Sequence, residues 1–285
     1  MKYAPIVLFV YNRPDFTLRC LNKLSEANEI ENFNLYIFSD GHKNDQDNVN
    51  VEKVRGIIES RNWAKTTTVI KSKENKGLSH QIINGIQDIF KENDRVIVLE
   101  DDIIIEKDVL FFLNTNLNRF EAESDIYQIT AFQFPIKSFK KYELVYLPNI
   151  STWAWATWKS KWKSSNNEEV ISFVRKLNNN KLYRYWFNLL GGYPYSNIVS
   201  KEASGDLKTW GIRFLIHVFK KNGKVVYPGS SMITNIGFTF EATNTKTDPG
   251  FFTNNDESTK KSKSTRKFVL LNMYILSRYL KSLKK

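Results

Sequence analysis

The feature that most constrains this chain is a short apolar run that ends in three consecutive acidic residues. Residues 96–102 read Val-Ile-Val-Leu-Glu-Asp-Asp. Four β-favouring residues in a row are typical of a strand that is buried on both faces of a parallel sheet. In open α/β sheets, ligands bind at the edge formed by the carboxyl ends of the strands. We therefore expect such a sheet, with Glu100, Asp101 and Asp102 at its ligand-binding edge.

These three adjacent carboxylates also predict a bound cation. Side by side they repel one another unless a positive charge lies among them. Mg²⁺ and Mn²⁺ prefer oxygen ligands, and they commonly combine one or two protein carboxylates with phosphate oxygens. Taken alone, the stretch is equally compatible with an acidic loop that binds nothing. The rest of the chain has to decide between the two interpretations.

The composition indicates a globular protein of a reducing compartment. Of the 285 residues, 41% are hydrophobic and 14% aromatic, which is enough to bury a large core. Cys20 is the single cysteine, which excludes an intrachain disulfide, and three histidines without a Cys/His cluster argue against a zinc site. We find no convincing secretory signal and no apolar stretch long enough to cross a bilayer. We therefore expect a cytoplasmic protein.

The positive charge is concentrated at one end of the chain. Nine of the twelve net positive charges lie from Ser258 onward, where no acidic residue occurs. The main body is thus only weakly basic, and we expect no nucleic-acid partner. The segment 260–285 also carries apolar residues on one broad helical arc. It fits a helix lying on an anionic membrane surface at the inner face of the cell membrane, or equally a terminal helix docked on the protein.

Strand and helix signals alternate along the first 130 residues, which predicts βαβ units and a mainly parallel sheet with helices on both faces. We assign residues 1–130 to a nucleotide-binding half. An irregular, aromatic-rich half of the same domain, 131–257, should bind the second substrate, and 258–285 form the basic tail. The predicted strands are 5–11, 33–39, 66–71, 96–99, 126–132, 144–147 and 224–227, and the predicted helices start at Pro14 and cover 47–61, 77–90, 108–121 and 206–220.

Polar residues follow the predicted strands at the edge where ligands are expected. Tyr11, Asn12 and Arg13 follow the first strand, and Asp40 follows the second. Neither a glycine-rich dinucleotide fingerprint nor a phosphate-binding P-loop follows the first strand, which argues against NAD enzymes and P-loop NTPases. A carboxylate edge with Asn and Arg nearby suits a nucleotide diphosphate held through a metal ion.

At this point the sequence resembles a known family. Several motifs in order are similar to those of GT-A glycosyltransferases, especially the inverting N-acetylglucosaminyltransferase I type and bacterial sugar transferases of surface polysaccharides. The resemblance covers roughly residues 4–247. The motifs are Asn12-Arg13-Pro14, Ser39-Asp40, Asn75-Lys76-Gly77-Leu78, Leu99-Glu100-Asp101-Asp102, the segment 151–158, Asp206 with Trp210, and Asn235-Ile236-Gly237-Phe238 leading to Ala242-Thr243.

The resemblance implies a role for each matching residue. Asp102 would be the Mn²⁺ (or Mg²⁺) ligand, and Asp101 would lie near the donor sugar or ribose. Asp40 would recognise the nucleobase side, and Arg13 would lie near the nucleotide. Asp206 would be the catalytic base that deprotonates the acceptor hydroxyl. We further assign donor contacts to the residues that complete these motifs, namely Tyr11, Asn12, Gly77, Leu78, Glu100 and Trp155.

The implied activity is metal-dependent transfer of a sugar, with inversion, from a nucleotide diphosphate to a hydroxyl group. We expect UDP-sugar as the donor and a glycan or lipid-linked glycan of surface polysaccharide synthesis as the acceptor. The metal would neutralise the leaving diphosphate. Asn244 replaces a histidine that bacterial relatives often carry, so a contact from that loop to the site is open.

Simpler interpretations stand beside these assignments. Asp206 is also in an ordinary position for a helix N-cap, and any single tryptophan between Trp153 and Trp162 is more often a core residue than a sugar contact. A sugar-phosphate nucleotidyltransferase shares the sheet and the metal, but it needs a glycine-rich loop after the first strand, which Tyr11-Asn12-Arg13-Pro14 does not provide. A non-catalytic module that binds glycan or nucleic acid is the alternative of another class.

Overall fold

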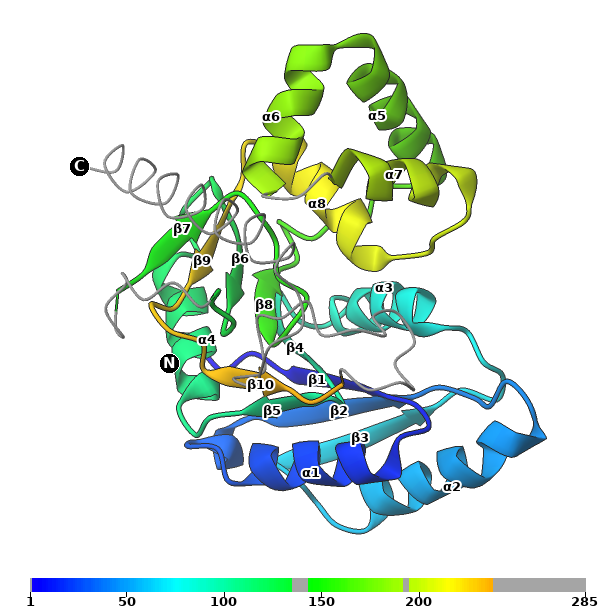
Figure 1. The fold of residues 1–285 in the computed structure, drawn as a ribbon. Coiled ribbons are helices and arrows are strands. Elements are labelled where there is room, and N and C mark those ends of the chain that lie inside the picture. Colours follow the sequence, from blue (N-terminus) through cyan, green and yellow to red (C-terminus); the bar gives the residue numbers. More distant parts are fainter. Residues whose placement is uncertain (1, 135–142, 192–194, 238–285) are drawn as a thin grey trace, which may run out of the picture.

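The computed structural model describes residues 2–134, 143–191 and 195–237, and Figure 1 shows their arrangement. An eight-stranded sheet runs through these residues in the order β3-β2-β1-β4-β8-β6-β9-β7, and β10 pairs separately with β5. The strands are β1 (Ile6–Val10), β2 (Asn34–Ser39), β3 (Thr66–Lys71), β4 (Arg95–Glu100), β5 (Ile103–Ile105), β6 (Ile126–Thr130), β7 (Val145–Leu147), β8 (Trp155–Trp158), β9 (Lys224–Tyr227) and β10 (Ile233–Asn235). The helices are α1 (Pro14–Ser25), α2 (Asp45–Glu59), α3 (Leu78–Ile89), α4 (Val109–Arg119), α5 (Asn167–Asn179), α6 (Lys181–Gly191), α7 (Tyr195–Ser204) and α8 (Trp210–Lys220).

The sheet is mainly parallel, as predicted. Strands β3, β2, β1 and β4 are parallel neighbours, and β6 is parallel to β9. Strands β8 and β7 run against their neighbours. The second half of the chain therefore continues the sheet of the first half, and the carboxyl ends of β1, β2 and β4 come together at one edge.

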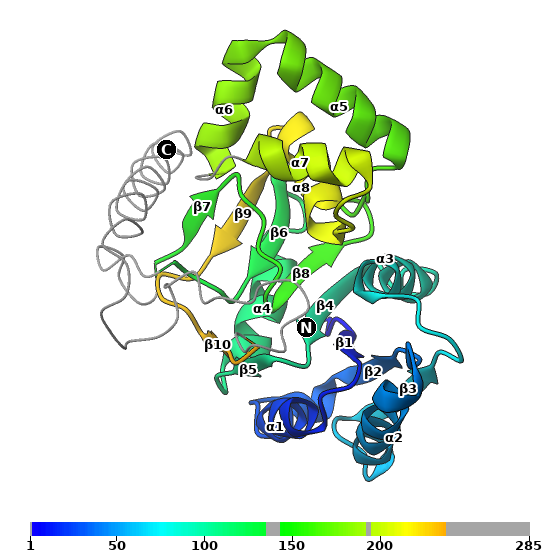
Figure 2. The same ribbon diagram turned by 45° about the vertical axis from the view of Figure 1, so that its right-hand side comes forward.

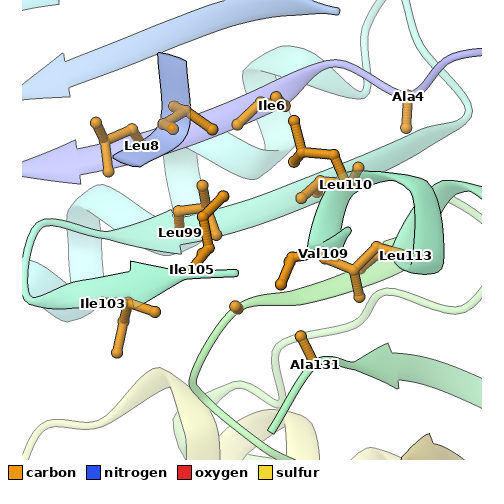
Figure 3. Packing of buried hydrophobic residues seen from close by; sticks show 14 of the residues in the cluster. Ala4, Ile6, Leu8, Leu99, Ile103, Ile105, Val109, Leu110, Leu113 and Ala131 are labelled. Carbon is orange, nitrogen blue, oxygen red and sulfur yellow. The ribbon is translucent and has the colours of Figure 1, made fainter. Parts of the chain in front are cut away.

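Helices cover both faces of the sheet. Successive strand residues point to opposite sides, so alternate residues of one strand pack against different helices. Ile6 and Leu8 of β1 pack with residues of α1, α2 and α4 in one core cluster, part of which Figure 3 shows. Val7 and Phe9 pack in a second cluster with α3 and α8. Burial of both faces explains why these strands read as unbroken apolar runs rather than alternating ones.

Helices α5, α6 and α7 form a layer of their own on the side of the sheet that α8 covers (Figure 2). Helix α8 joins this layer to the sheet by using two faces. Trp210 and Phe214 pack toward the sheet, and Ile212 and Leu215 pack with α5 and α7. The three helices of this layer were not predicted, because their apolar residues face one another and α8 instead of one flat sheet.

The structure changes the start of one predicted helix and adds two short strands. Helix α8 begins at Trp210 and not at Asp206, and its N-cap is Thr209. The prediction that a helix starts at Asp206 is therefore wrong, and so is its N-cap interpretation. Strands β5 and β10 were not predicted because each has only three residues, too few to show a periodicity.

The contact between α3 and the sheet leads to a stability prediction. A Cβ atom at Gly85 of α3 would lie 2.8 Å from the ring of Phe9, which is 3% exposed and stacked on Phe38, so that ring has little room to move. Gly56 of α2 has no atom within 4 Å of such a Cβ position. We expect Gly85→Ala to lower the free energy of unfolding, since overpacking costs about 1–3 kcal/mol against a gain of about 1 kcal/mol in helix propensity.

Gly56→Ala is the matched control, and it should raise the free energy of unfolding by up to about 1 kcal/mol through the same gain in propensity. Urea unfolding of both variants and the wild type measures the two effects. Shifts of the same sign in both variants would contradict the close packing of α3 on β1.

Candidate active site

A cavity of about 1240 Å³ opens at the carboxyl ends of β1, β2 and β4. On one side it is lined by the segments that follow these strands and by the start of α3. On the other side its wall comes from residues 149–153 and from α5, α7 and the start of α8. The cavity therefore joins the two halves that the sequence predicted, and it has room for two substrates side by side.

The acidic triplet lies in this cavity with one arginine beside it. Arg13, just before α1, donates from Nη1 to Oδ2 of Asp102 at 3.2 Å. Burial, together with repulsion from Asp102 and Asp101, raises the pKa of Glu100 well above its usual value, and burial raises the pKa of Asp101 to about 7. The pKa of Asp102 is also raised by burial, although Arg13 acts in the opposite direction. The raised pKa values mean that the triplet takes up protons unless further positive charge lies beside it.

The chain after β10 encloses Asp102 from the other side. Antiparallel pairing of β10 with β5 brings Ile236 to Asp102, and the Ile236 N–H donates to the Asp102 carbonyl at 2.9 Å. A Cβ atom at Gly237 would lie 2.2 Å from Oδ2 of Asp102, so only glycine leaves space for this carboxylate. Asn235 accepts from the Gly237 N–H at 2.7 Å and holds the turn. Asn235 and Gly237 both line the cavity.

The carboxylate of Asp40 is largely occupied by the protein itself. Oδ1 accepts from the N–H groups of Gly41 and Lys76, both at 2.9 Å, and from the side chain of Gln81 at 2.8 Å. Oδ2 accepts from the N–H of Gly77 at 2.9 Å. A carboxylate offers about four acceptor positions. Asp40, which is 5% exposed, therefore shapes the loop before α3, and a ligand can reach little more than the remaining position on Oδ2.

This loop lines the cavity on the same side as the triplet. Gly77 has φ +78°, a left-handed conformation that glycine adopts without strain. Leu78 begins α3 with its side chain 37% exposed, and both residues line the cavity as the predicted donor contacts require. The geometry of the loop depends on Asp40, because three of the four donors to that carboxylate come from residues 76–81.

Tyr11 and Asn12 are held by one acid of the first turn of α2. The Tyr11 hydroxyl donates to Oδ2 of Asp47 at 2.8 Å, and the Asn12 amide donates to Oδ1 at 2.9 Å. Burial, and then the bond to Asp47, raises the pKa of Tyr11, so the hydroxyl stays protonated. The bond from Tyr11 in turn lowers the pKa of Asp47. Asp47 thus orients two residues of the predicted donor site, a role that the sequence analysis missed.

Asp206 lies beside the cavity on the turn between α7 and α8. Its Oδ2 accepts from the Ser204 hydroxyl at 2.6 Å, and the turn passes through Gly205 at φ +84°. Ser204 and Gly205 line the cavity, whereas the exposed side chain of Asp206 does not. The turn therefore brings Asp206 to the rim of the cavity rather than to its wall.

A buried acid holds this rim in place, and the sequence analysis missed it too. The side chain of Glu202 accepts from the Thr209 N–H at 2.7 Å and from Arg213 Nε at 2.7 Å. It thereby ties the end of α7 to the first turn of α8. Glu202 is one of several acids in an irregular stretch, and no periodicity in the sequence marks it as buried.

Trp155 lies in the core and not in the cavity. It is fully buried on β8, where its ring stacks on Trp210 at 4.8 Å and on Trp162 at 5.5 Å between centroids. A ring enclosed in this way has no surface left for a ligand, so the prediction that Trp155 contacts the donor is corrected. Trp153, two residues earlier, is partly buried and lines the cavity.

Two predicted features lie outside the described residues, namely Asn244 and the basic tail from Ser258. Within the ranges that the structure does describe, none of the helices has both the length and the apolar content that crossing a bilayer requires. In the same ranges, no group of three or more His, Cys, Asp or Glu side chains is arranged to hold a metal ion.

The comparisons with known proteins differ in what they find. No curated protein matches the sequence. A crystal structure of S. aureus TarS matches with 15% identity and a TM-score of 0.33, over 53% of this chain and 25% of the TarS chain, so this chain spans about a quarter of that protein. The family model described as Glycosyl transferase family 2 matches residues 6–191, which is more than half of the chain and includes the strand that ends in the acidic triplet. The chain belongs to glycosyl transferase family 2, and its mainly parallel α/β sheet is that of a GT-A fold.

Proposed function

We propose that this enzyme transfers a sugar from UDP to a hydroxyl group of a growing surface polysaccharide, with a divalent metal ion and with inversion at the anomeric carbon. The observation that carries the proposal is the three adjacent carboxyl groups that line a cavity shared by both halves of the domain, with Arg13 as the cation beside Asp102. A sugar nucleotide supplies the missing partner, since its diphosphate can complete the shell of a cation at Asp102.

The donor would lie on the side of the cavity that the strand ends form. Arg13 is placed to contact the diphosphate, and Asp101 and Glu100 face the sugar or ribose. The Asp40-bound loop at Gly77 and the Asp47-bound Tyr11 form the walls for the nucleoside. Bound Mn²⁺ or Mg²⁺ would neutralise the charge that develops on the leaving diphosphate.

The acceptor would lie on the opposite side, between the start of α8 and residues 149–153. There we assign Asp206 as the base that takes the proton of the acceptor hydroxyl. This assignment is supported by the position of Asp206 directly after Ser204 and Gly205, which line the cavity. A hydroxyl that attacks from this side, opposite the diphosphate, inverts the anomeric carbon. The hydrogen bond from Ser204 orients the carboxylate of Asp206.

The first prediction concerns the metal site. A panel of UDP-, GDP-, dTDP- and CMP-sugars, measured by thermal shift with and without Mn²⁺, should show the largest shift for a UDP-sugar with Mn²⁺. Asp102→Ala and Asp102→Asn should abolish the Mn²⁺-dependent part of that shift, because the proposed protein ligand is lost. A free ligand concentration of 100 times the dissociation constant stabilises the folded protein by about 2.7 kcal/mol, which a thermal shift detects easily.

Glu106→Ala is the control for a lost acid, since Glu106 is exposed and lies just beyond the triplet at the end of β5. It should keep the full shift. If the Asp102 variants also keep the Mn²⁺-dependent shift, Asp102 is not the metal ligand.

The second prediction concerns the base. Asp206→Asn should bind the UDP-sugar as tightly as the wild type but lower kcat by about 10²–10⁴-fold, the usual contribution of a general base. UDP release in the presence of acceptor glycans measures kcat, and titration calorimetry measures donor binding. Glu168→Gln, which changes an exposed acid in α5, should leave both unchanged. An Asp206→Asn variant with wild-type kcat would exclude Asp206 as the base.

The third prediction concerns Asp47. Asp47→Asn should weaken UDP binding about 3–10-fold, because Asn offers one accepting oxygen in place of two, so one of the bonds that orient Tyr11 and Asn12 loses its acceptor and the other becomes neutral. Asp45→Asn, in the same first turn of α2 but exposed, should have no such effect. Titration calorimetry with UDP and Mn²⁺ measures both variants. Equal affinities would show that Tyr11 and Asn12 do not depend on Asp47 for binding.

A further inference from the structure

Helix α6 is apolar on two faces, and only one of them has a partner in the described structure. Its inner face packs against the other helices of its layer. The ring of Phe187 lies 5.1 Å from Phe173 of α5 and 4.9 Å from Phe219 of α8, and the ring of Tyr183 lies 5.4 Å from Phe219. This face accounts for how α6 is held in the fold.

The outer face presents large apolar side chains to solvent. Leu182 is 66% exposed, Tyr185 61% and Trp186 48%. At 3.6 residues per turn, the three fall within about 100° of the helix circumference. Helices α7 and α8 lie between α6 and α3 in both ribbon views, so this outer face lies at the periphery of the molecule (Figures 1 and 2). A clustered apolar surface of this kind marks an interaction site rather than ordinary surface.

The charge around this face has one sign. No acidic residue occurs between Glu169 and Glu202. The same stretch holds five basic residues, of which four belong to α5 and α6 and are exposed. The five are Arg175, Lys176, Lys181, Arg184 and Lys201. Lys176 also lies over the ring of Tyr183, with its Nζ 4.2 Å from the ring centroid, so this cation lies directly beside α6.

We propose that the outer face of α6 docks on an anionic membrane surface. Tyr and Trp suit the level of lipid headgroups because each ring has an apolar body and a polar group. The surrounding cations complement the negative surface of anionic lipids. A second copy of this chain fits less well, because a twofold contact through α6 would bring two positive surfaces together. The inference does not depend on the identity of the donor sugar.

The test is sedimentation of the full chain with vesicles of phosphatidylcholine alone and of phosphatidylcholine mixed with phosphatidylglycerol. The triple variant Leu182→Ser, Tyr185→Ser, Trp186→Ser should bind the mixed vesicles about tenfold or more weakly than the wild type. Lys181→Gln with Arg184→Gln should lose only the preference for anionic vesicles and its salt dependence. The control is Val49→Ser with Phe111→Ser, two equally exposed apolar residues on α2 and α4, which should bind like the wild type.

Unfolding curves and light scattering without vesicles accompany the test. If the triple variant is unstable, Leu182→Ser alone replaces it, since the most exposed of the three residues contributes least to the fold. Equal sedimentation of the α6 variants and the wild type would overturn the proposal. So would a wild-type dimer that the triple variant converts to monomers, which would make α6 a contact between copies. UDP binding by the α6 variants without vesicles should equal that of the wild type, so failure here leaves the proposed function standing.

Discussion

The negative charge gathered where β4 ends is the constraint on which the site depends. Three carboxylates follow one another in a partly enclosed place, with Arg13 as the one cation in contact with Asp102 among the residues described. Such an arrangement is costly to the isolated fold, as the raised pKa values of Glu100 and Asp101 show. Without further positive charge, these carboxyl groups take up protons more readily than ordinary ones. A cation beside them would favour their ionised forms.

The surrounding structure keeps this charge in place by satisfying every neighbouring group internally. Asp40 binds the loop before α3, Asp47 binds Tyr11 and Asn12, and Glu202 binds the start of α8. Each of these acids accepts two or more hydrogen bonds from the protein. The triplet differs from them in degree. Oδ2 of Asp101 accepts from the Tyr11 N–H and the Thr17 hydroxyl, both at the long distance of 3.4 Å, and Asp102 accepts from Arg13 at 3.2 Å.

The sheet edge that carries the acidic triplet could be predicted from sequence, and the reason is physical. A strand that is buried on both faces produces an unmistakable apolar run, so the residue at which Leu99 gives way to Glu100 is visible without a structure. Parallel strands then bring their ends to one edge, and Arg13, Asp40 and Asp102 line one cavity there. Trp155 was misassigned because the sequence does not show that β8 begins at this residue and buries its ring. Trp153 lies before β8, on the other side of Ala154 with its φ of +42°, and lines the cavity.

The acceptor side could not be predicted in the same way because it is held by side-chain contacts between irregular segments. The bond from Glu202 to the Thr209 N–H joins residues on a turn and at the end of a helix, where no repeat of 2.0 or 3.6 residues exists. Gly237 is a second residue whose role depends on a contact that the sequence does not show. Its place in a motif was evident, but the need for glycine there follows only from the distance to the Asp102 carboxylate, which precedes the neighbouring strand β5. Residues whose role is to leave space for another residue are the hardest to recognise in a single sequence, because what they contribute is the absence of a side chain.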